Sequence, residues 1–276
     1  MSKSLKEERL GATNYNNQGC LMKIVEYNSI RNVIVEFQDK YKCQKKTQWD
    51  YFQKGSIDNP YHPSVCGVGM HGIKYPICVN GKKTKEYIAW KDMLYRSCSD
   101  KNKLPKSQIA YINVTCCKEW LLFENFYEWL HSQENFEVWK SNKGFALDKD
   151  ILVKGNKVYS PETCCLVPER VNALFVRAYG KDKKTTGLPI GVKKDNSKYN
   201  CAKPYYATYW SKDVVSQNGS HHIFLGSAKT PEEAFQIYKQ YKEAYIKQVT
   251  QEEYDKGTIS KKCYEAMMRW EVEIND

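Results

Sequence analysis

Thr230-Pro-Glu-Glu-Ala-Phe235 decides the fold of the C-terminal part of the chain. Thr at the N-cap, Pro at the first helical position and Glu at the third form a capping box, so this stretch predicts a helix from residue 231 to about residue 249. The positions expected to be buried repeat at helical spacing and are Ala234, Phe235, Tyr238, Tyr241, Tyr245 and Val249. A last helix is expected over residues 258–272, and the final sixth of the chain carries no recognisable chemistry.

Three short strands are predicted before this helix, at residues 190–192, 205–210 and 222–225. Turn residues separate them, at Asn196-Ser197 and at Asn218-Gly219. The pattern predicts a three-stranded sheet packed on the helix.

This part of the chain resembles the APETALA2-like DNA-binding domain, through Gly191-Val192, Tyr206-Ala-Thr-Tyr-Trp210, Phe224-Leu-Gly226 and the capped helix start. The resemblance implies that the sheet contacts DNA in the major groove. The implied DNA-binding residues are Lys193, Lys194, Lys198, Tyr206, Tyr209 and Trp210. Lys and Tyr stand here in place of most of the family's Arg. Because Lys is suited to phosphate and Arg to guanine, we expect contacts mainly to the DNA backbone.

The middle of the chain predicts a strand over residues 145–153, a turn at 154–156, a strand over 158–167 and a helix over 169–175. This ββα order resembles the HNH (ββα-metal) nuclease unit that phages carry. The resemblance implies that Asp148 and Asn172 hold Mg2+ or Mn2+, and that Lys149 occupies the position of the general base. An ordinary lysine is protonated at neutral pH and cannot accept a proton, so we expect the nuclease activity to be lost or weak.

Two helices are expected upstream of this unit, over residues 87–99 and 118–131, with aromatic residues forming their core. Their Trp, Met, Arg and Cys spacing is similar to that of phage HNH-like proteins. Within this central segment Arg96 and Lys154 are candidate phosphate contacts. An imported general base, His62 or His71, is the alternative to Lys149.

The N-terminal segment predicts a small, barrel-like sheet, with strands at residues 21–27 and 33–37. The expected fold class is α+β with four segments. These are a small β domain (1–60), a linker or loop region (61–86), the HNH-like domain (87–180), and the APETALA2-like domain with a C-terminal helix (181–276).

Charge is distributed unevenly along the chain. The chain carries 43 Lys and Arg against 32 Asp and Glu, a formal net charge of +11. Residues 181–230 hold nine Lys against three Asp, whereas residues 231–276 hold seven basic and ten acidic side chains. A basic sheet in front of an acidic helix is typical of a surface that faces phosphate. The protein should therefore bind nucleic acid.

Composition excludes several classes. A hydrophobic content of 41% is too high for a disordered chain. The longest apolar runs are far shorter than a membrane span, and the first residues lack the apolar core of a secretory signal, so no membrane contact is expected. Eleven cysteines without export, including the adjacent pairs Cys116-Cys117 and Cys164-Cys165, indicate reduced core thiols rather than zinc ligands.

The charge pattern predicts a nucleic-acid-binding protein, and the two resemblances imply that it is a phage or prophage DNA-binding protein in the bacterial cytoplasm. Double-stranded DNA is the expected ligand, RNA is the alternative, and binding should need no cofactor. Two other functions stay open: an active metal-dependent HNH homing or nicking endonuclease, and an inhibitor of a host defence nuclease (anti-CRISPR-like). The acidic, aromatic segment Glu252–Asp276 is the hint for the inhibitor.

Overall fold

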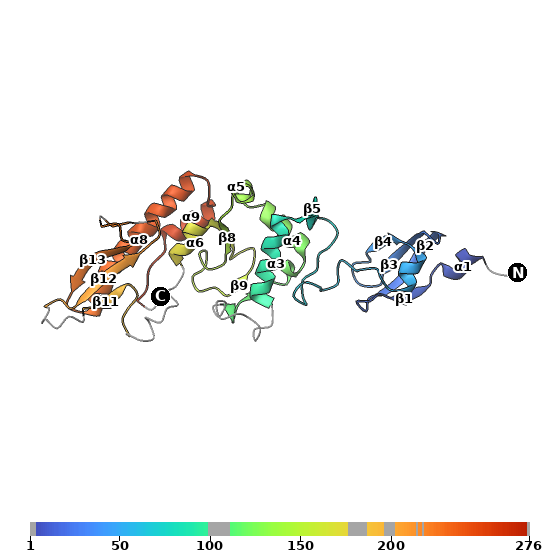
Figure 1. Ribbon diagram of the computed structural model, residues 1–276, viewed down its shortest axis with the longest axis horizontal. Coiled ribbons are helices and arrows are strands. Elements are labelled where there is room, and N and C mark those ends of the chain that lie inside the picture. Colours follow the sequence, from blue (N-terminus) through green and yellow to red (C-terminus); the bar gives the residue numbers. More distant parts are fainter. Residues whose placement is uncertain are drawn as a thin grey trace. The chain divides into compact units, whose positions relative to one another are not determined.

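The computed structural model describes residues 4–98, 111–175, 187–195, 202–213, 215–216 and 218–274 (Figure 1). The fold is mixed α+β, as predicted, and it is built from several small sheets. The chain forms two compact units. Unit 1 comprises Met1–Ser132 and Lys157–Glu162, and unit 2 comprises Gln133–Asn156 and Thr163–Asp276. Lys198, one of the predicted DNA contacts, lies outside the described residues.

Unit 1 begins with helix α1 (Leu5–Arg9) and an antiparallel sheet in the order β1-β2-β3-β4. The strands are β1 (Thr13–Tyr15), β2 (Leu21–Ser29), β3 (Asn32–Phe37) and β4 (Gln44–Thr47). The predicted hairpin between the second and third strands is confirmed. One sheet face is apolar, and helix α2 (Trp49–Gln53) covers it through Phe52. The expected barrel-like closure is wrong for the described residues, because β1 and β4 do not pair and the helix buries the apolar face instead.

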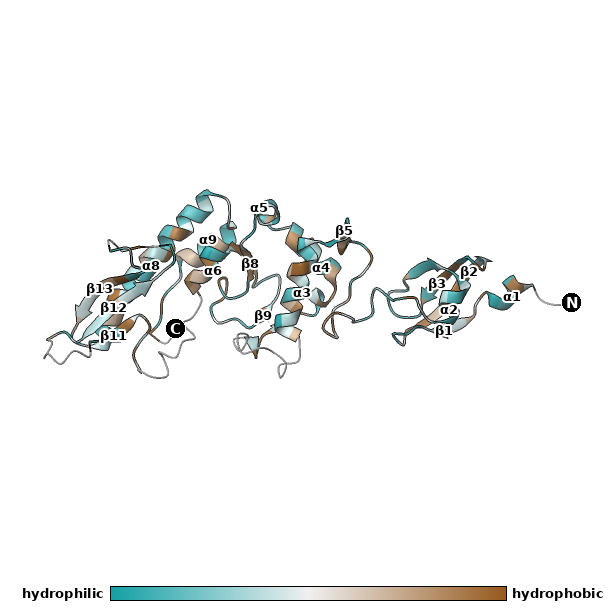
Figure 2. Cartoon of the chain, viewed as in Figure 1, coloured by the Kyte–Doolittle hydropathy of each residue, from teal (hydrophilic) through white to brown (hydrophobic). Residues whose placement is uncertain are grey.

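The rest of unit 1 is built around helix α3 (Lys85–Cys98) and helix α4 (Phe123–His131). Strands β5 (Cys78–Val79) and β6 (Lys82–Lys83) form a small hairpin, and β7 (Thr115–Cys116) pairs in parallel with β9 (Val158–Tyr159). Both main helices carry hydrophobic stretches (Figure 2). The predicted aromatic core is confirmed: Trp90, Trp120, Phe123 and Phe126 are buried. The second predicted helix is interrupted, because Leu122 is extended between the 3-10 turn η3 (Glu119–Leu121) and α4.

Unit 2 contains the strand, strand, helix order predicted for the middle of the chain. Strand β8 (Phe145–Asp148) pairs with β10 (Cys165–Pro168), and helices α5 (Phe136–Ser141) and α6 (Glu169–Phe175) flank them. The predicted hairpin with a turn at 154–156 is wrong, because β9 pairs with β7 and residues 149–164 separate the two paired strands. The first strand ends early because the Asp148 carboxylate accepts the N–H groups of the next turn, from Asp150 and Ile151.

The C-terminal sheet of unit 2 has the antiparallel order β11-β12-β13. Its strands are β11 (Val192–Lys194), β12 (Tyr205–Trp210) and β13 (His222–Ala228), and helix α8 (Pro231–Asp255) lies along one face (Figure 1). The N-cap is confirmed, since Thr230 Oγ1 accepts the Glu233 N–H at 3.2 Å. The Glu233 carboxylate, however, reaches the N–H of Lys229 rather than that of Thr230. Helix α8 runs six residues further than predicted.

Gly191 sets the close approach of β11 to α8. Its φ is +74°, and a Cβ there would lie 2.1 Å from the Tyr238 ring. Glycine is therefore the residue that fits both the backbone and the space. Helix α9 (Lys261–Met268) completes the core with Cys263 and Met267. Of the described helices, none combines the length and the apolar character that a membrane crossing requires.

Candidate nucleic-acid interface

The register of the three C-terminal strands separates the sheet into two faces. Val192 pairs with Ala207 and both are buried under α8. Their neighbours Lys193 and Tyr206 also pair, and alternation along a strand places them on the opposite side. We call this side the open face; its residues on the three strands are Lys193, Tyr206, Thr208, Trp210, His222, Phe224 and Ser227.

A β-bulge keeps this face continuous on β13. The register shifts between Ala207 and Thr208, whose partners are Gly226 and Phe224, so Leu225 is the additional residue. Leu225 packs against the core beneath the sheet. Phe224 consequently lies on the open face, whereas simple alternation from Gly226, which faces α8, would place it on the α8 side.

The open face is aromatic and carries one lysine. Phe224 is 64% exposed and Trp210 is 53% exposed. The centroid of the Tyr206 ring lies 6.2 Å from that of Phe224. Lys193 is exposed and forms no hydrogen bond or ion pair with a described residue. Large apolar side chains left exposed together mark an interaction surface more often than chance exposure.

The structure brings together three of the six predicted DNA-binding residues of this sheet, Lys193, Tyr206 and Trp210. Lys194 is exposed on the other side of β11, with its Nζ 5.7 Å from the Tyr205 ring centroid. Tyr209 is 5% exposed and also faces α8. Phe224 was missed as a site residue. Phe224 stands between two other apolar residues, Ile223 and Leu225, and such a run predicts a buried strand when the bulge is not known.

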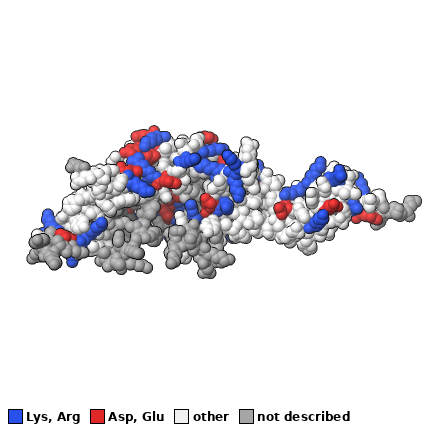
Figure 3. All heavy atoms as spheres, in the orientation of Figure 1, with Lys and Arg blue, Asp and Glu red and all other residues white. Residues whose placement is uncertain are grey.

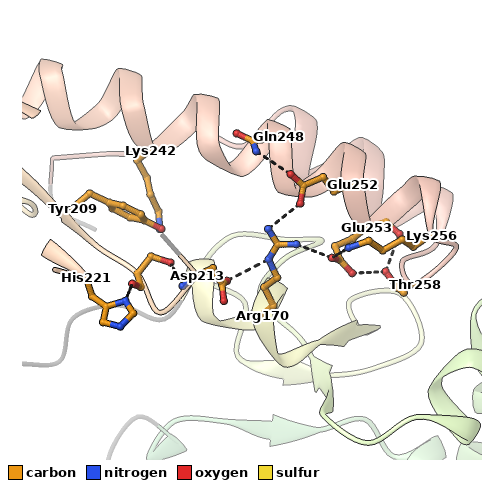
Figure 4. Close-up of polar contacts among 11 residues, drawn as sticks. Arg170, Tyr209, Asp213, His221, Lys242, Gln248, Glu252, Glu253, Lys256 and Thr258 are labelled. Atoms are coloured by element: carbon orange, nitrogen blue, oxygen red, sulfur yellow. Dashed lines mark hydrogen bonds and ion pairs between the residues drawn. The ribbon is translucent and has the colours of Figure 1, made fainter. Parts of the chain in front are cut away.

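The side of the sheet that faces α8 holds Lys242 beside Tyr209 (Figure 4). Lys242 Nζ lies 3.4 Å from the Tyr209 hydroxyl and 4.8 Å from its ring centroid. Burial lowers the pKa of Lys242 to about 8. Burial likewise raises the pKa of Tyr209, and the neighbouring hydroxyl of Tyr245 adds to that rise. The side of the sheet that faces α8 is therefore part of the packed core, and a large ligand cannot reach it.

Arg170 is held inside an acidic cluster in unit 2 (Figure 4). Its guanidinium contacts Asp213 at 3.2 Å, Glu252 at 2.9 Å and Glu253 at 3.0 Å. Glu253 is buried and accepts further hydrogen bonds from Lys256 and Thr258. The cluster ties α6 to α8 and to the segment after β12, so Arg170 is engaged in the fold and not offered to phosphate.

The two predicted metal ligands, Asp148 and Asn172, both lie in unit 2, on β8 and α6. The Asp148 Oδ1 accepts the N–H of Asp150 at 2.7 Å and that of Ile151 at 2.8 Å. Burial raises the pKa of Asp148 in spite of these hydrogen bonds. Asn172 is half-buried on α6, and no hydrogen bond joins it to Asp148. Across the described ranges, no three His, Cys, Asp or Glu side chains lie close enough to hold a metal ion.

Lys149, at the predicted position of the general base, is a buried structural residue. Its Nζ contacts Asp150 Oδ2 at 2.6 Å and the backbone oxygen of Asn156 at 3.3 Å. The Asn156 side chain donates in return to the Lys149 backbone oxygen. These hydrogen bonds between Lys149 and Asn156 hold together the loop that follows β8. The alternative base His71 contacts the Tyr87 hydroxyl, and burial lowers its pKa; His62 contacts Cys20 at 3.5 Å.

The remaining predicted phosphate contacts are both partnered. Arg96 of unit 1 lies with its guanidinium 5.7 Å from the Tyr111 ring centroid. Lys154 of unit 2 donates to the Glu271 backbone oxygen and forms an ion pair with Glu273 at 3.1 Å. Lys154 also lines a hollow of about 320 Å³ together with Trp270 and Arg269. Neither residue belongs to the open face.

Basic side chains are spread over the visible face of the protein, and acidic ones lie among them in the region of α8 (Figure 3). The acidic helix predicted behind the sheet is thus present, and some of its carboxylates form ion pairs, such as those with Arg170.

No family model, no curated protein and no solved structure matches this chain. The function is therefore argued from the site alone.

Proposed function

We infer that this protein binds nucleic acid on the open face of its C-terminal sheet. The observation that carries this proposal is the exposure of Trp210 and Phe224 beside Lys193 on one face of an otherwise well-packed sheet. Aromatic rings interleaved with cations contact bases and phosphates respectively, and this pairing is the usual composition of a nucleic-acid surface.

The charge of the chain supports the same proposal. Residues 181–230, which include the whole sheet, hold six more Lys than Asp. Association with a polyanion is driven by the release of its counterions when lysines neutralise phosphates. A net charge of +11 also favours the encounter with nucleic acid at low salt.

Neighbouring lysines on opposite faces give a direct test. Lys193→Glu reverses a charge on the open face, and Lys194→Glu reverses one on the other side of the same strand. We expect Lys193→Glu to weaken DNA binding about fivefold or more and to flatten its dependence on salt, because one phosphate contact is lost. Lys194→Glu, which changes the net charge equally, is the matched control and should have a clearly smaller effect.

The measurement is fluorescence anisotropy with labelled DNA, offered as a duplex and as separate strands, titrated from low to physiological salt without metal. Equal losses from the two variants would show that binding depends on net charge and not on this face. Absence of binding to either DNA form at low salt would end the proposal. The nuclease alternative is not favoured, since Asp148 serves as a turn cap.

A further inference from the structure

The three aromatic residues of the open face are arranged as one platform. Tyr206 and Trp210 lie four residues apart on β12, and Phe224 pairs with Thr208, which lies between them. Even spacing along a strand places Tyr206, Thr208 and Trp210 on the same side. Phe224 is therefore a diagonal neighbour of both residues, and its ring centroid lies 6.2 Å from that of Tyr206.

The rings remain accessible although they are close together. The Tyr206 and Phe224 rings are 6.2 Å apart and inclined by 36°, so neither ring buries the other by face-to-face stacking. Phe224 and Trp210 keep more than half of their surface exposed. Exposed rings on a sheet are the surfaces on which unpaired bases stack, one base on each ring.

A duplex does not offer bases in this form. Neighbouring bases of a duplex strand stack at about 3.4 Å, and only their edges are open in the grooves. The ring separation of 6.2 Å is nearly twice that rise, so the two rings fit bases that have been drawn apart. Arg, Asn and Gln, which make many of the bidentate contacts to base edges in the grooves, are absent from the open-face residues on the three strands.

Lys193 supplies the charge that such a strand requires. It pairs with Tyr206 across β11 and β12, so its ammonium lies beside one end of the platform. A lysine side chain donates hydrogen bonds but accepts none, so on the described open face only hydroxyl and imidazole groups, such as those of Thr208 and Ser227, could accept from a ribose 2′-hydroxyl. The charge of Lys193 therefore fits a phosphate of the strand, and stacking of bases on the rings requires no 2′-hydroxyl.

We propose that the open face binds single-stranded DNA, with bases stacked on Tyr206, Trp210 and Phe224 and a phosphate on Lys193. The proposal rests on the proposed function and narrows it to unpaired strands. It also differs from the duplex expected from the sequence, because it uses the faces of the aromatic rings as the main contact.

Anisotropy of the full chain with a labelled DNA strand of about 12 nucleotides, its blunt duplex and the matching RNA tests the proposal. We expect the single DNA strand to bind at least tenfold tighter than the duplex and tighter than the RNA. Trp210→Leu and Phe224→Leu keep an apolar side chain without an aromatic face; each should weaken binding about five- to 150-fold. Trp210→Phe should restore most of the affinity, and Tyr15→Leu, an equally exposed tyrosine of unit 1, is the control.

Each outcome decides one proposal. Tighter binding to duplex or RNA, or unchanged affinity in both leucine variants, overturns the single-strand proposal. If Lys193→Glu still weakens duplex binding in that case, nucleic-acid binding on this face stands by itself. Absence of binding by the wild-type chain to the DNA strand, the duplex and the RNA overturns both proposals. Melting temperatures close to wild type establish that the leucine variants are folded, as the exposure of both side chains predicts.

Discussion

The chain contains two antiparallel sheets that each bury one face under a helix, and their outer faces differ. In the N-terminal sheet, Lys23, Glu36 and Gln44 lie side by side across three strands. The Glu36 carboxylate accepts hydrogen bonds from the side chains of Gln38 and Gln44, which lower its pKa. Polar side chains of this row therefore form hydrogen bonds with one another. Tyr15 on the edge strand is the only strongly exposed aromatic residue of that sheet.

The C-terminal sheet leaves its outer face without such partners. Trp210 and Phe224 are exposed, and Lys193 has no acidic neighbour in register, since it pairs with Tyr206. A face that serves only as solvent boundary is expected to resemble the N-terminal one, with charged and polar pairs. Two sheets of similar architecture therefore present different outer faces, and the exposed aromatic face of the C-terminal sheet is the candidate interaction surface.

The largest expected effect compares two phenylalanines on strands. Phe37 of β3 is fully buried, whereas Phe224 of β13 is 64% exposed. Phe37→Ala should destabilise unit 1 by about 3–5 kcal/mol through lost burial and the cavity left behind. Phe224→Ala should change stability by less than about 0.5 kcal/mol. Thermal unfolding followed by circular dichroism measures both, and a large loss from Phe224→Ala would mean that the open face is covered in the folded protein.

The second prediction concerns the face that α8 covers. The pKa of Lys242 is lowered to about 8, so folding carries a penalty for its charged form at lower pH. The unfolded chain binds the proton up to about pH 10.5, and wild-type stability should therefore rise between pH 8 and pH 10.5. Lys242→Met should stabilise unit 2 by about 1–2 kcal/mol at pH 7, after allowance for the lost contact with Tyr209.

Denaturant unfolding at a series of pH values provides the measurement. The gain from Lys242→Met should shrink as the pH rises above 8 and should vanish near 10.5. Lys239, on the same helix but paired with Glu243, offers a control position, because Lys239→Met removes a partnered charge instead. A stability gain that does not depend on pH would contradict a buried, charged Lys242.

Sequence periodicity predicted correctly those elements whose structure depends only on the pattern of apolar residues along the chain. Strand β12 and the burial in α3 follow from alternation and helical spacing, and both are confirmed. The rules failed where a side chain redirected the backbone: the Asp148 carboxylate ended β8, and β9 joined a strand far earlier in the chain. Tyr209 was expected at the DNA because the resemblance assigned a whole strand, yet neighbouring residues of a strand face opposite ways.

The third prediction transfers charge reversal to the other sheet. Lys23→Glu places a second carboxylate opposite Glu36 on the N-terminal sheet. If only the open face of the C-terminal sheet binds DNA, Lys23→Glu should change affinity by less than about twofold at moderate salt. Lys193→Glu should lower it about fivefold, which corresponds to about 1 kcal/mol. Equal losses measured by anisotropy would mean that the two outer faces are functionally alike.

The smallest expected effect separates a turn cap from a metal site at Asp148. Burial raises the pKa of this carboxyl in the folded protein, so the folded state disfavours the ionised form. The free energy of unfolding is therefore lower at pH 7 than at a pH below the pKa of the unfolded chain, as far as this group is concerned. Asp148→Asn keeps an oxygen for the N–H groups of Asp150 and Ile151 and removes the charge. Stability should therefore change by less than about 1 kcal/mol, and any change should be a gain. Asp148→Ala, which leaves both N–H groups without their acceptor, should be less stable than Asp148→Asn. A melting temperature that rises with Mg2+ or Mn2+ in the wild type, and does not rise in Asp148→Asn, would contradict the cap and restore a metal-binding ββα unit.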